Sequence, residues 1–599
     1  MKKVKIIAAG ILTCLTANMS HSAPFMQNEK RIDDLLAQMT LDEKIGQMVQ
    51  PDLSCVADRA DIQKYGFGSM LSGGDSKPAG ANNPANWVAT GNELQSWALK
   101  TRLKIPLIYG IDAVHGHNDV IGTTIFPHHI GLGATRNPKL IEQAEHVTAE
   151  EVAGTGIRWA FAPCVAVVQD ERWGRTYESY GQDPKLVSEL GAAAVKGLQG
   201  GELSAKPDSV LACAKHFIGD GGTAGGKDQG DVACDEATLR KLYLPPYRAA
   251  VDAGVGSIMV SYSSWNGVKM HSNKYLLTDV LKGELGFRGF LVSDWAAIDQ
   301  LSPDYKNDVE ISINAGLDMV MIPNGPGKMN NYVEFIEDLK ALVAGGKVSP
   351  ARIDDAVRRI LRIKFQMGLF ENARTDAALT GKIGSAEHRQ IARECVQQSL
   401  VLLKNSSHTL PLAKNLKHLV VVGAAADDLG RQCGGWTVSW QGSGQLTRGT
   451  TILEAIRKTV SPETVVTFSP DGGEIKNADA VIAVVGEAPY AEMKGDRTNL
   501  ELATNDVALV AQARAAGAPV VTLLISGRPL ILNSALADSS AFVAAWLPGT
   551  EGQGVADVLF GDVKPTGKLP REWPRDNDQL AANKLAGKPL FKFGFGLTY

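Results

Sequence analysis

Gly289-Phe-Leu-Val-Ser-Asp-Trp295 is a short apolar run that ends abruptly in a carboxylate and an indole. The apolar residues follow a turn-forming glycine, which predicts a buried parallel strand over 290–293. In a βα barrel, side chains at the carboxyl ends of such strands are where chemistry is placed. An aspartate beside a flat indole suits a sugar, because the ring packs on the aromatic face while the carboxylate points at the reacting carbon. The alternative is an aspartate that caps the next helix beside a core tryptophan.

Size and charge restrict the classes of protein to consider. A chain of 599 residues is too long for one hydrophobic core, so two or more domains are expected. A net charge of −4 without a basic tract argues against nucleic acid or an anionic membrane as a partner.

The N-terminus, residues 1–23, has the features of a secretory signal peptide. A basic start, Met1-Lys-Lys-Val-Lys, precedes a mostly apolar stretch over 6–17 and the small residues of Ser20-His-Ser-Ala23. The apolar stretch is too short for a mature transmembrane helix, and no later run is long enough. We therefore expect an exported protein without a membrane span, periplasmic or extracellular, with the cleavage site left open.

The six cysteines beyond the leader are scattered: Cys55, Cys164, Cys213, Cys234, Cys395 and Cys433. They form no CxxC pair and lie near no paired histidines, so no metal site is expected. Cys213 and Cys395 lie in apolar or helical contexts, which favours buried thiols. One or two disulfides remain open, because sequence alone cannot pair them.

Strand-like and helix-like stretches alternate through the first part of the chain. Seven strand candidates are separated by helical stretches, among them 236–251 and 276–285, which predicts a (β/α)8-type barrel over 27–370. The candidate for an eighth strand is 48–51, and Thr40 with Glu43 predicts a capping box before the helix that precedes it. The seven strand candidates are 66–71, 106–111, 159–164, 210–217, 257–261, 290–293 and 317–322.

A second domain is expected to follow a polar linker over 371–386. A helix over 349–364, with a Ser cap and Pro in its first turn, closes the first domain. Residues 387–599 then resume the alternation and predict a smaller α/β sandwich domain. The glycines over 422–430 lack both the GxGxxG spacing and a phosphate-binding lysine, which argues against a nucleotide site. Its predicted strands are 400–403, 419–422, 465–468, 480–485, 520–525 and 541–546.

Polar residues follow five consecutive predicted strands of the first domain. Taken singly, each has an ordinary structural explanation; a lone histidine, for example, is more often part of the core. Together they would present donors and acceptors to a ring of hydroxyls, with Asp294 beneath the reacting carbon. The residues at these positions are Asp112, Arg175, Lys215, His216, Tyr262 and Asp294.

Several motifs resemble glycoside hydrolase family three, most closely its plant-type exo-acting β-D-glucan glucohydrolases. The resemblance runs through nearly the whole chain beyond the leader, in the order of the family. It implies a barrel followed by an α/β sandwich, with the active site between them. The motifs are Gly110-Ile-Asp-Ala-Val-His-Gly-His-Asn, Arg172-Trp-Gly-Arg-Thr-Tyr-Glu-Ser-Tyr, Lys215-His-Phe, Met259-Val-Ser-Tyr-Ser-Ser-Trp-Asn-Gly, Val292-Ser-Asp-Trp, Gln432-Cys-Gly-Gly-Trp-Thr437 and Gly486-Glu-Ala-Pro-Tyr-Ala-Glu-Met-Lys-Gly-Asp496.

The resemblance implies a catalytic pair, Asp294 as nucleophile and Glu492 as general acid/base. Retaining hydrolysis needs an ionised carboxylate and a protonated partner about 5–5.5 Å away. Partial burial would let Glu492 hold its proton. Glu487 and Asp496 are competing carboxylates in the same predicted loop.

Two tryptophans, Trp295 and Trp436, resemble the indoles that sandwich the next sugar unit in this subgroup. The alternative for Trp436 is simple packing in the domain interface. The sequence departs from the plant-type enzymes at Ala296 and Gln300, where those carry a Glu and an Arg, which puts one substrate contact in doubt. A disulfide of those enzymes near the Arg-Trp-Gly-Arg loop should be absent, because only Cys164 remains there.

The function expected from these residues is that of an exported, retaining exo-β-glucosidase acting on β-glucans and their oligosaccharides. A β-xylosidase of the same family is the first alternative, although Asp112, expected at the hydroxyls farthest from the scissile bond, favours a hexose. A catalytically inactive carbohydrate-binding protein is the second. No cofactor and no metal are expected, since hydrolysis by two carboxylates needs neither. The sequence leaves open the preferred linkage and whether the protein is a monomer or a homodimer.

Overall fold

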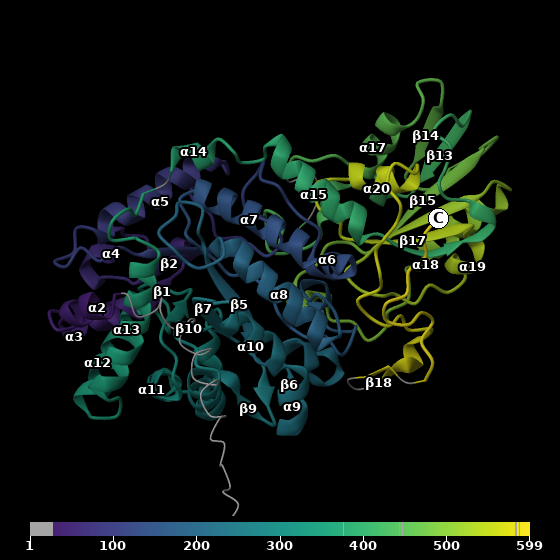
Figure 1. Ribbon diagram of the computed structural model, residues 1–599. Coiled ribbons are helices and arrows are strands. Elements are labelled where there is room, and N and C mark those ends of the chain that lie inside the picture. The colour runs from purple at the N-terminus through teal and green to yellow at the C-terminus, as the bar shows by residue number, and fades with distance from the viewer. Residues whose placement is uncertain are drawn as a thin grey trace, which may run out of the picture.

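The computed structural model describes residues 28–374, 376–442, 444, 447–473, 475–581, 584–585 and 587–599. The expected leader over 1–23 lies outside the described residues. Figure 1 shows two lobes, one holding a curled sheet surrounded by helices and the other a second sheet, with α15 (Ala386–Ser399) between them. In the described part of the chain, no helix is long and apolar enough to cross a membrane.

The first domain is built on parallel strands that curl into the expected barrel-type sheet. Six strands pair in the order β10-β7-β5-β4-β3-β2, and β1 pairs with β11. Parallel bridges Asp52–Leu71 and Val292–Met319 join this pair to the two edges of the six-stranded sheet. The predicted eighth strand is therefore present, as β1. The strands are β1 Val49–Pro51, β2 Ser69–Ser72, β3 Ile108–Ile111, β4 Trp159–Ala160, β5 Leu211–Phe217, β7 Ser257–Val260, β10 Phe290–Val292 and β11 Val320–Ile322.

The interior of this sheet is filled by side chains. All seven residues of β5 are buried, as expected for a parallel strand covered on both faces. Trp159 meets Phe161 and Phe290 edge to face, with ring centroids 4.9 Å and 5.1 Å apart. Gly110 makes room for this cluster, since a Cβ there would lie 2.5 Å from the Phe161 ring.

The helices follow the caps and prolines of the sequence, with two differences. The stretch expected as one helix over 236–251 is two, α9 and α10, because Pro245 and Pro246 supply no N–H groups and instead form the first turn of a new helix. The stretch expected as a helix over 276–285 is the π-helical segment Tyr275–Glu284. The helices of the first domain are α2 Glu29–Leu36, α3 Leu41–Gln47, α4 Ala60–Tyr65, α5 Pro84–Ala98, α6 His129–Thr135, α7 Pro138–Gly154, α8 Pro184–Gln199, α9 Glu236–Leu242, α10 Leu244–Asp252, α11 Tyr305–Ala315, α12 Tyr332–Ala344 and α13 Pro350–Gln366.

Between α13 and α15 the chain includes the short helix α14 (Ala377–Thr380). The Thr380 hydroxyl donates to the Gly154 carbonyl at 2.7 Å, which fastens this stretch to the end of α7. Three short strands, β6 Asp231–Val232, β8 Ser264–Trp265 and β9 Val268–Lys269, form a small sheet beside the barrel.

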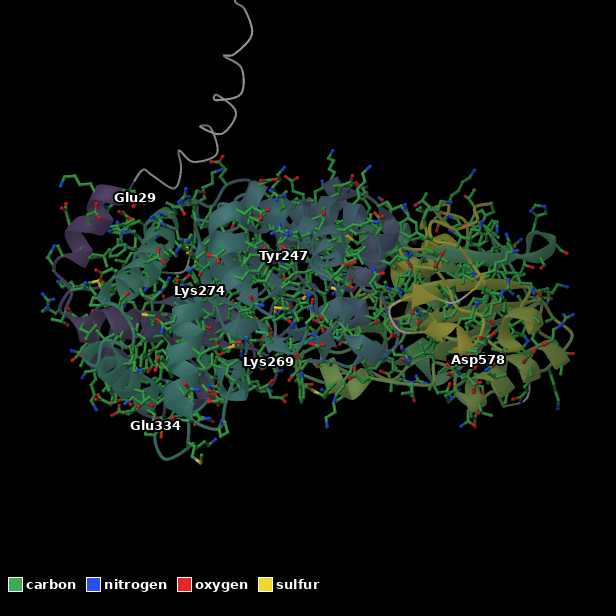
Figure 2. The ribbon with its side chains drawn as sticks, turned by 90° about the horizontal axis from the view of Figure 1, so that it is seen from below. Glu29, Tyr247, Lys269, Lys274, Glu334 and Asp578 are labelled. Atoms are coloured by element: carbon green, nitrogen blue, oxygen red, sulfur yellow. The ribbon has the colours of Figure 1, made fainter. Side chains whose placement is uncertain are left out.

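The second domain is an open α/β sheet with strand order β12-β17-β16-β15-β13-β14. Only β12 runs antiparallel, against β17, among the strands described in this sheet. Figure 2 shows the two domains side by side, with Asp578 marking the second. The elements of the second domain are β12 Val401–Asn405, β13 His418–Val422, α16 Leu429–Cys433, α17 Ile452–Thr459, β14 Val465–Ser469, β15 Ala480–Gly486, α18 Thr504–Ala515, β16 Val520–Ile525, α19 Ala535–Asp538, β17 Ala541–Trp546, α20 Gln553–Leu559, β18 Leu580–Ala581 and β19 Lys584–Leu585.

Candidate functional site

A pocket of about 490 Å³ lies between the carboxyl ends of the barrel strands and loops of the second domain. Eight of its residues come from polar strand ends or aromatic positions singled out in the sequence, and the ninth from the predicted acidic loop. The structure brings all nine together: Asp112, Arg175, Lys215, His216, Tyr262, Asp294, Trp295, Trp436 and Glu492. Trp440, Gln229, Asp75 and Met493 also line the pocket and carried no sequence signal strong enough to select them.

Asp294 lies just beyond β10 and is 9% exposed. Its Oδ1 accepts a hydrogen bond from the Trp295 backbone N–H at 2.7 Å, while Oδ2 lies 3.7 Å from Nε2 of His216. Oδ2 has no hydrogen-bond partner among the described residues. Burial raises the pKa of Asp294 to about 6, although nearby Arg175 and Lys215 oppose that rise.

Glu492 begins a 3₁₀ turn, Glu492–Gly495, in the loop that follows β15. Its Oε1 accepts a hydrogen bond from Nη1 of Arg175 at 3.1 Å. Burial raises the pKa of Glu492 to about 8; Arg175 lowers it, and the carboxylates of Asp228 and Asp294 raise it further. The two carboxyl groups thus have different protonation preferences in one pocket.

Arg175 is the link between the barrel and Glu492. Its Nε and Nη2 donate to the Glu178 carboxylate at 3.0 Å and 2.8 Å, and Nη2 lies 3.3 Å from Nε2 of His216. Glu178 is buried and also accepts from the indole N–H of Trp436 at 3.2 Å. Glu178 was not selected from the sequence, although it stands in the same Arg-Trp-Gly-Arg-Thr-Tyr-Glu motif as Arg175.

Lys215 and His216 are adjacent residues near the carboxyl end of β5, and their side chains have different partners. Nζ of the buried Lys215 lies 3.0 Å from Oδ1 of Asp112, at the end of β3. Nδ1 of His216 lies 2.8 Å from Oδ2 of Asp220. Burial, with Arg175 and Lys215 nearby, holds the pKa of His216 well below its usual range, so the ring is neutral at pH 7. Because Arg175 faces Nε2, the proton of the neutral ring is placed on Nδ1, toward Asp220.

The aromatic residues form the outer wall of the pocket. Trp295 is 41% exposed, and the hydroxyl of Tyr262 donates to its backbone carbonyl. Trp436 is nearly buried, with its ring 6.0 Å from Nζ of Lys215. The backbone N–H of Trp436 donates to the carbonyl of Trp440 at 3.0 Å, so the second domain contributes two indoles to the pocket.

The two competing carboxylates near Glu492 have other partners. Glu487 accepts hydrogen bonds from the Tyr490 hydroxyl at 3.0 Å and the Gly527 N–H at 3.1 Å, and is 3.3 Å from Arg528. Asp496 accepts from two backbone N–H groups of the barrel. Neither lines the pocket that holds Asp294.

Gln300, where the plant-type enzymes have an arginine, lies at the rim beside Gln229. It accepts a hydrogen bond from Nζ of Lys269 at 2.9 Å and donates to Oε1 of Gln229 at 3.1 Å. Ala296, the other departure, has a positive φ of 49°. Gln300 therefore contacts the pocket through Gln229, which lines it.

The six described cysteines are free thiols, and Cys213 and Cys395 are buried as predicted. Cys164 donates to Oε2 of Glu178 at 3.4 Å. The disulfides that the sequence left open are therefore not formed among these residues.

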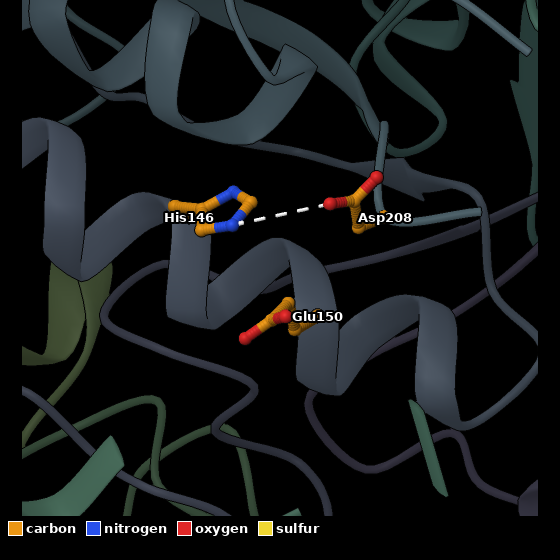
Figure 3. Close-up of side chains that lie close together, drawn as sticks. All are labelled: His146, Glu150 and Asp208. Atoms are coloured by element: carbon orange, nitrogen blue, oxygen red, sulfur yellow. Dashed lines mark ion pairs between the residues drawn. The ribbon is translucent and has the colours of Figure 1, made fainter. Parts of the chain in front are cut away.

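A cluster of possible metal ligands lies away from the pocket, formed by His146 and Glu150 of α7 and by Asp208, which precedes β5. Nε2 of His146 is 3.9 Å from Oδ2 of Asp208, with Glu150 below them (Figure 3). The carboxylate of Glu150 is already bound to Nζ of Lys382 and, at 3.0 Å, to Nε2 of His388. The lysine ammonium supplies the positive charge, so we interpret the cluster as an ion network that joins α7 to α15.

Comparison with known proteins covers both domains. Residues 40–363 match the glycosyl hydrolase family 3 N-terminal domain and residues 400–599 its C-terminal domain. A lysosomal beta glucosidase of Dictyostelium discoideum is 35% identical over 95% of this chain and 76% of its own length. A periplasmic beta-glucosidase of Salmonella typhimurium is 34% identical, covering 95% of this chain and 80% of its own.

Among solved structures, an exo-1,3/1,4-beta-glucanase from a Pseudoalteromonas species superimposes with a TM-score of 0.90 at 43% identity, over 95% of this chain and 74% of that one. The barrel and the second sheet therefore agree with matches that run through both domains in the same order. The chain belongs to glycosyl hydrolase family 3.

Proposed function

We propose that this protein is a retaining exo-β-glucosidase that removes terminal non-reducing β-D-glucosyl residues from β-glucans and their oligosaccharides. One observation carries the proposal: two carboxyl groups from different domains line one pocket, and their pKa values are raised to about 6 and about 8. Near pH 7 Asp294 is then ionised while Glu492 keeps its proton. Glycoside hydrolysis by two carboxyl groups requires one ionised and one protonated group, and the resemblance to the family supports the retaining course.

The reaction has two displacements. Asp294 forms a bond to C1 of the sugar as the bond from C1 to the glycosidic oxygen breaks, and Glu492 gives that oxygen its proton. Water then attacks C1, the Glu492 carboxylate takes a proton from this water, and Asp294 is released. Arg175 lies beside both groups and stabilises the charge on whichever carboxylate is ionised.

Substrate binding is divided between charged and aromatic residues. Asp112, Lys215, Arg175 and His216 offer hydrogen-bond partners to the hydroxyls of the terminal sugar. Trp295 and Trp436 are placed to pack on the next sugar unit. Asp112, which pairs with Lys215 at 3.0 Å, is the residue that we expect at the hydroxyls farthest from the scissile bond, which favours a hexose over a pentose.

Export is part of the proposal. A leader of basic, apolar and small residues over 1–23 supports it. The match to a protein named as a periplasmic beta-glucosidase supports the periplasm as the destination.

The test is sugar release from aryl β-glucoside, β-xyloside and N-acetyl-β-glucosaminide, with wild type and Asp294→Ala. We expect strong preference for the glucoside and a loss on the order of 10⁴-fold in the variant, because the nucleophile is gone. Faster release from the xyloside would favour the β-xylosidase alternative. Equal rates for wild type and variant would exclude Asp294 as the nucleophile, and binding of glucan without any turnover would favour the inactive binding protein.

A further inference from the structure

The two carboxyl groups of the proposed reaction belong to different domains. Asp294 follows β10 of the barrel, whereas Glu492 lies in a loop of the second domain. Their relative position therefore depends on how that loop is held against the barrel. A misplacement of about 1 Å at a reacting group can cost on the order of 100-fold in rate, so this contact is important for catalysis.

Asp496, four residues after Glu492, ties the loop to two segments of the barrel domain. Its Oδ1 accepts a hydrogen bond from the Gly174 N–H at 2.8 Å, and its Oδ2 accepts one from the Asp228 N–H at 2.9 Å. Gly174 directly precedes Arg175, which binds the Glu492 carboxylate, and Asp228 directly precedes another residue of the pocket wall. One carboxylate thus connects the Glu492 loop to the immediate neighbours of two pocket residues.

The backbones of the two loops touch at Gly174. A Cβ on this residue would lie 1.9 Å from the carbonyl oxygen of Glu492 and 2.9 Å from the backbone nitrogen of Asp496, which no side chain could occupy. Arg528 reinforces the contact: its Nη2 donates to the Gly495 carbonyl at 2.6 Å, and its Nη1 donates to a carbonyl of the same barrel loop at 3.1 Å. The backbone around Glu492 is therefore seated directly on the barrel.

We propose that Asp496 is a positioning residue for proton donation by Glu492. Its carboxylate holds the loop against the barrel in the position from which the Glu492 proton reaches the glycosidic oxygen. The inference rests on the proposed function, in which that proton is transferred as the bond to C1 breaks and Asp294 bonds to C1. Asp496 itself lies outside the pocket wall and touches no substrate.

A displaced general acid slows only those substrates whose leaving group needs a proton, whereas general destabilisation of the protein slows all substrates alike. The sugar oxygen that leaves from cellobiose is a poor leaving group and needs a proton from the acid. 2,4-Dinitrophenolate is a stable anion and leaves without one. General acid assistance is worth about 10²–10⁴-fold, and only the first kind of substrate uses it. The value of kcat/KM reports the first bond-breaking step, so comparing the two substrates isolates the position of the acid.

The experiment compares Asp496→Asn with wild type on cellobiose and on 2,4-dinitrophenyl β-glucoside. Asparagine keeps the volume of the side chain but turns an N–H donor toward a backbone N–H, so one of the two hydrogen bonds is lost. We expect kcat/KM for cellobiose to fall about 30–100-fold and that for the dinitrophenyl substrate to fall less than about threefold. Equal losses on both substrates, or no loss, would overturn the positioning role.

Two further variants keep the inference separate from the proposed function. Glu492→Gln must itself show the selective loss; if it does not, the acid assignment fails, whatever Asp496 does. Asp479→Asn is a control for an aspartate-to-asparagine change far from the pocket, because Oδ2 of Asp479 also accepts two backbone N–H groups, at 2.7 Å and 2.9 Å, at the opposite end of β15. It should leave both kcat/KM values unchanged, and a selective loss there would contradict the positioning argument.

A second route tests the same contact from the barrel side. Gly174→Ala places a methyl group against the Glu492 carbonyl and should displace the loop while Asp496 itself stays unsubstituted. We expect the same selective loss on cellobiose, and wild-type values for both substrates would contradict the inference even where Asp496→Asn failed to fold.

Discussion

Asp294 and Glu492 are similar side chains that the fold places in different surroundings. Asp294 has Arg175, Lys215 and His216 around it, and the two cations limit the rise that burial imposes on its pKa. Glu492 has Arg175 on one side and feels the carboxylates of Asp228 and Asp294, so its pKa rises further. The proposed assignment of acid and nucleophile therefore follows from burial and neighbouring charges and not from residue type.

The pH dependence of kcat/KM follows from these two groups. Activity should fall as the pH drops through about 6, because Asp294 takes up a proton, and as it rises through about 8, because Glu492 loses its proton. A bell-shaped profile with an aryl β-glucoside would report the two groups as a coupled pair. In Glu492→Gln the alkaline limb should disappear; a persisting limb would assign it to another residue.

At the scale of elements, helix caps account for much of what the local sequence specifies. The predicted capping box is confirmed in α3, where Thr40 Oγ1 accepts from the Glu43 N–H at 3.3 Å and Glu43 Oε2 accepts from the Thr40 N–H at 2.9 Å. The next element is β1, which pairs with β11. This cap therefore fixes the start of the helix that leads into the barrel sheet.

Thr40→Ala should lower the free energy of unfolding by about 1 kcal/mol, because the Glu43 N–H in the first turn loses its acceptor. Urea denaturation followed by circular dichroism measures the change. Thr40→Ser keeps the oxygen and should restore most of the loss, while kcat/KM stays at the wild-type value in both variants. A wild-type midpoint for Thr40→Ala would mean that the cap contributes nothing to stability.

At the scale of the whole molecule, a buried ion pair joins the two domains. Nε of Arg571, from the second domain, lies 2.9 Å from Oε1 of Glu171 in the barrel domain, and both side chains are almost fully buried. Nη1 of Arg571 also donates to the carbonyl of Val168. Glu171 lies in the same barrel loop as Gly174 and Arg175, which contact the Glu492 loop. The pair therefore supports the domain interface close to the pocket.

Arg571→Ala should destabilise the protein by about 3–5 kcal/mol, because it leaves the Glu171 carboxylate buried without a partner. Differential scanning calorimetry should show a lower Tm or two separated transitions. The double variant Glu171→Gln/Arg571→Met removes both charges and should recover part of the loss. A single transition at the wild-type Tm in Arg571→Ala would show that the pair does not hold the domains together.

The sequence by itself determined the strands of both main sheets, their order along the chain and the positions of nine pocket residues. Periodicity and caps are local signals, so the barrel strands, the eighth strand at β1 and all six strands of the second sheet could be located from short windows. Because parallel strands end at the same edge of a barrel, Asp112, Lys215 and Asp294 could be placed together from their positions at predicted strand ends.

Only the tertiary structure decided which loop residues face the pocket. Glu487, Glu492 and Asp496 lie in one stretch with equivalent chemistry. Contacts with the barrel domain place Glu492 in the pocket and bind Asp496 to backbone N–H groups, whereas Glu487 binds Gly527 and Arg528 within its own domain. The roles of the buried Glu178, which binds Arg175, and of Trp440, which lines the pocket, were likewise found only in the tertiary structure. The conformation of a loop depends on partners far away in the chain, and a local pattern carries no record of them.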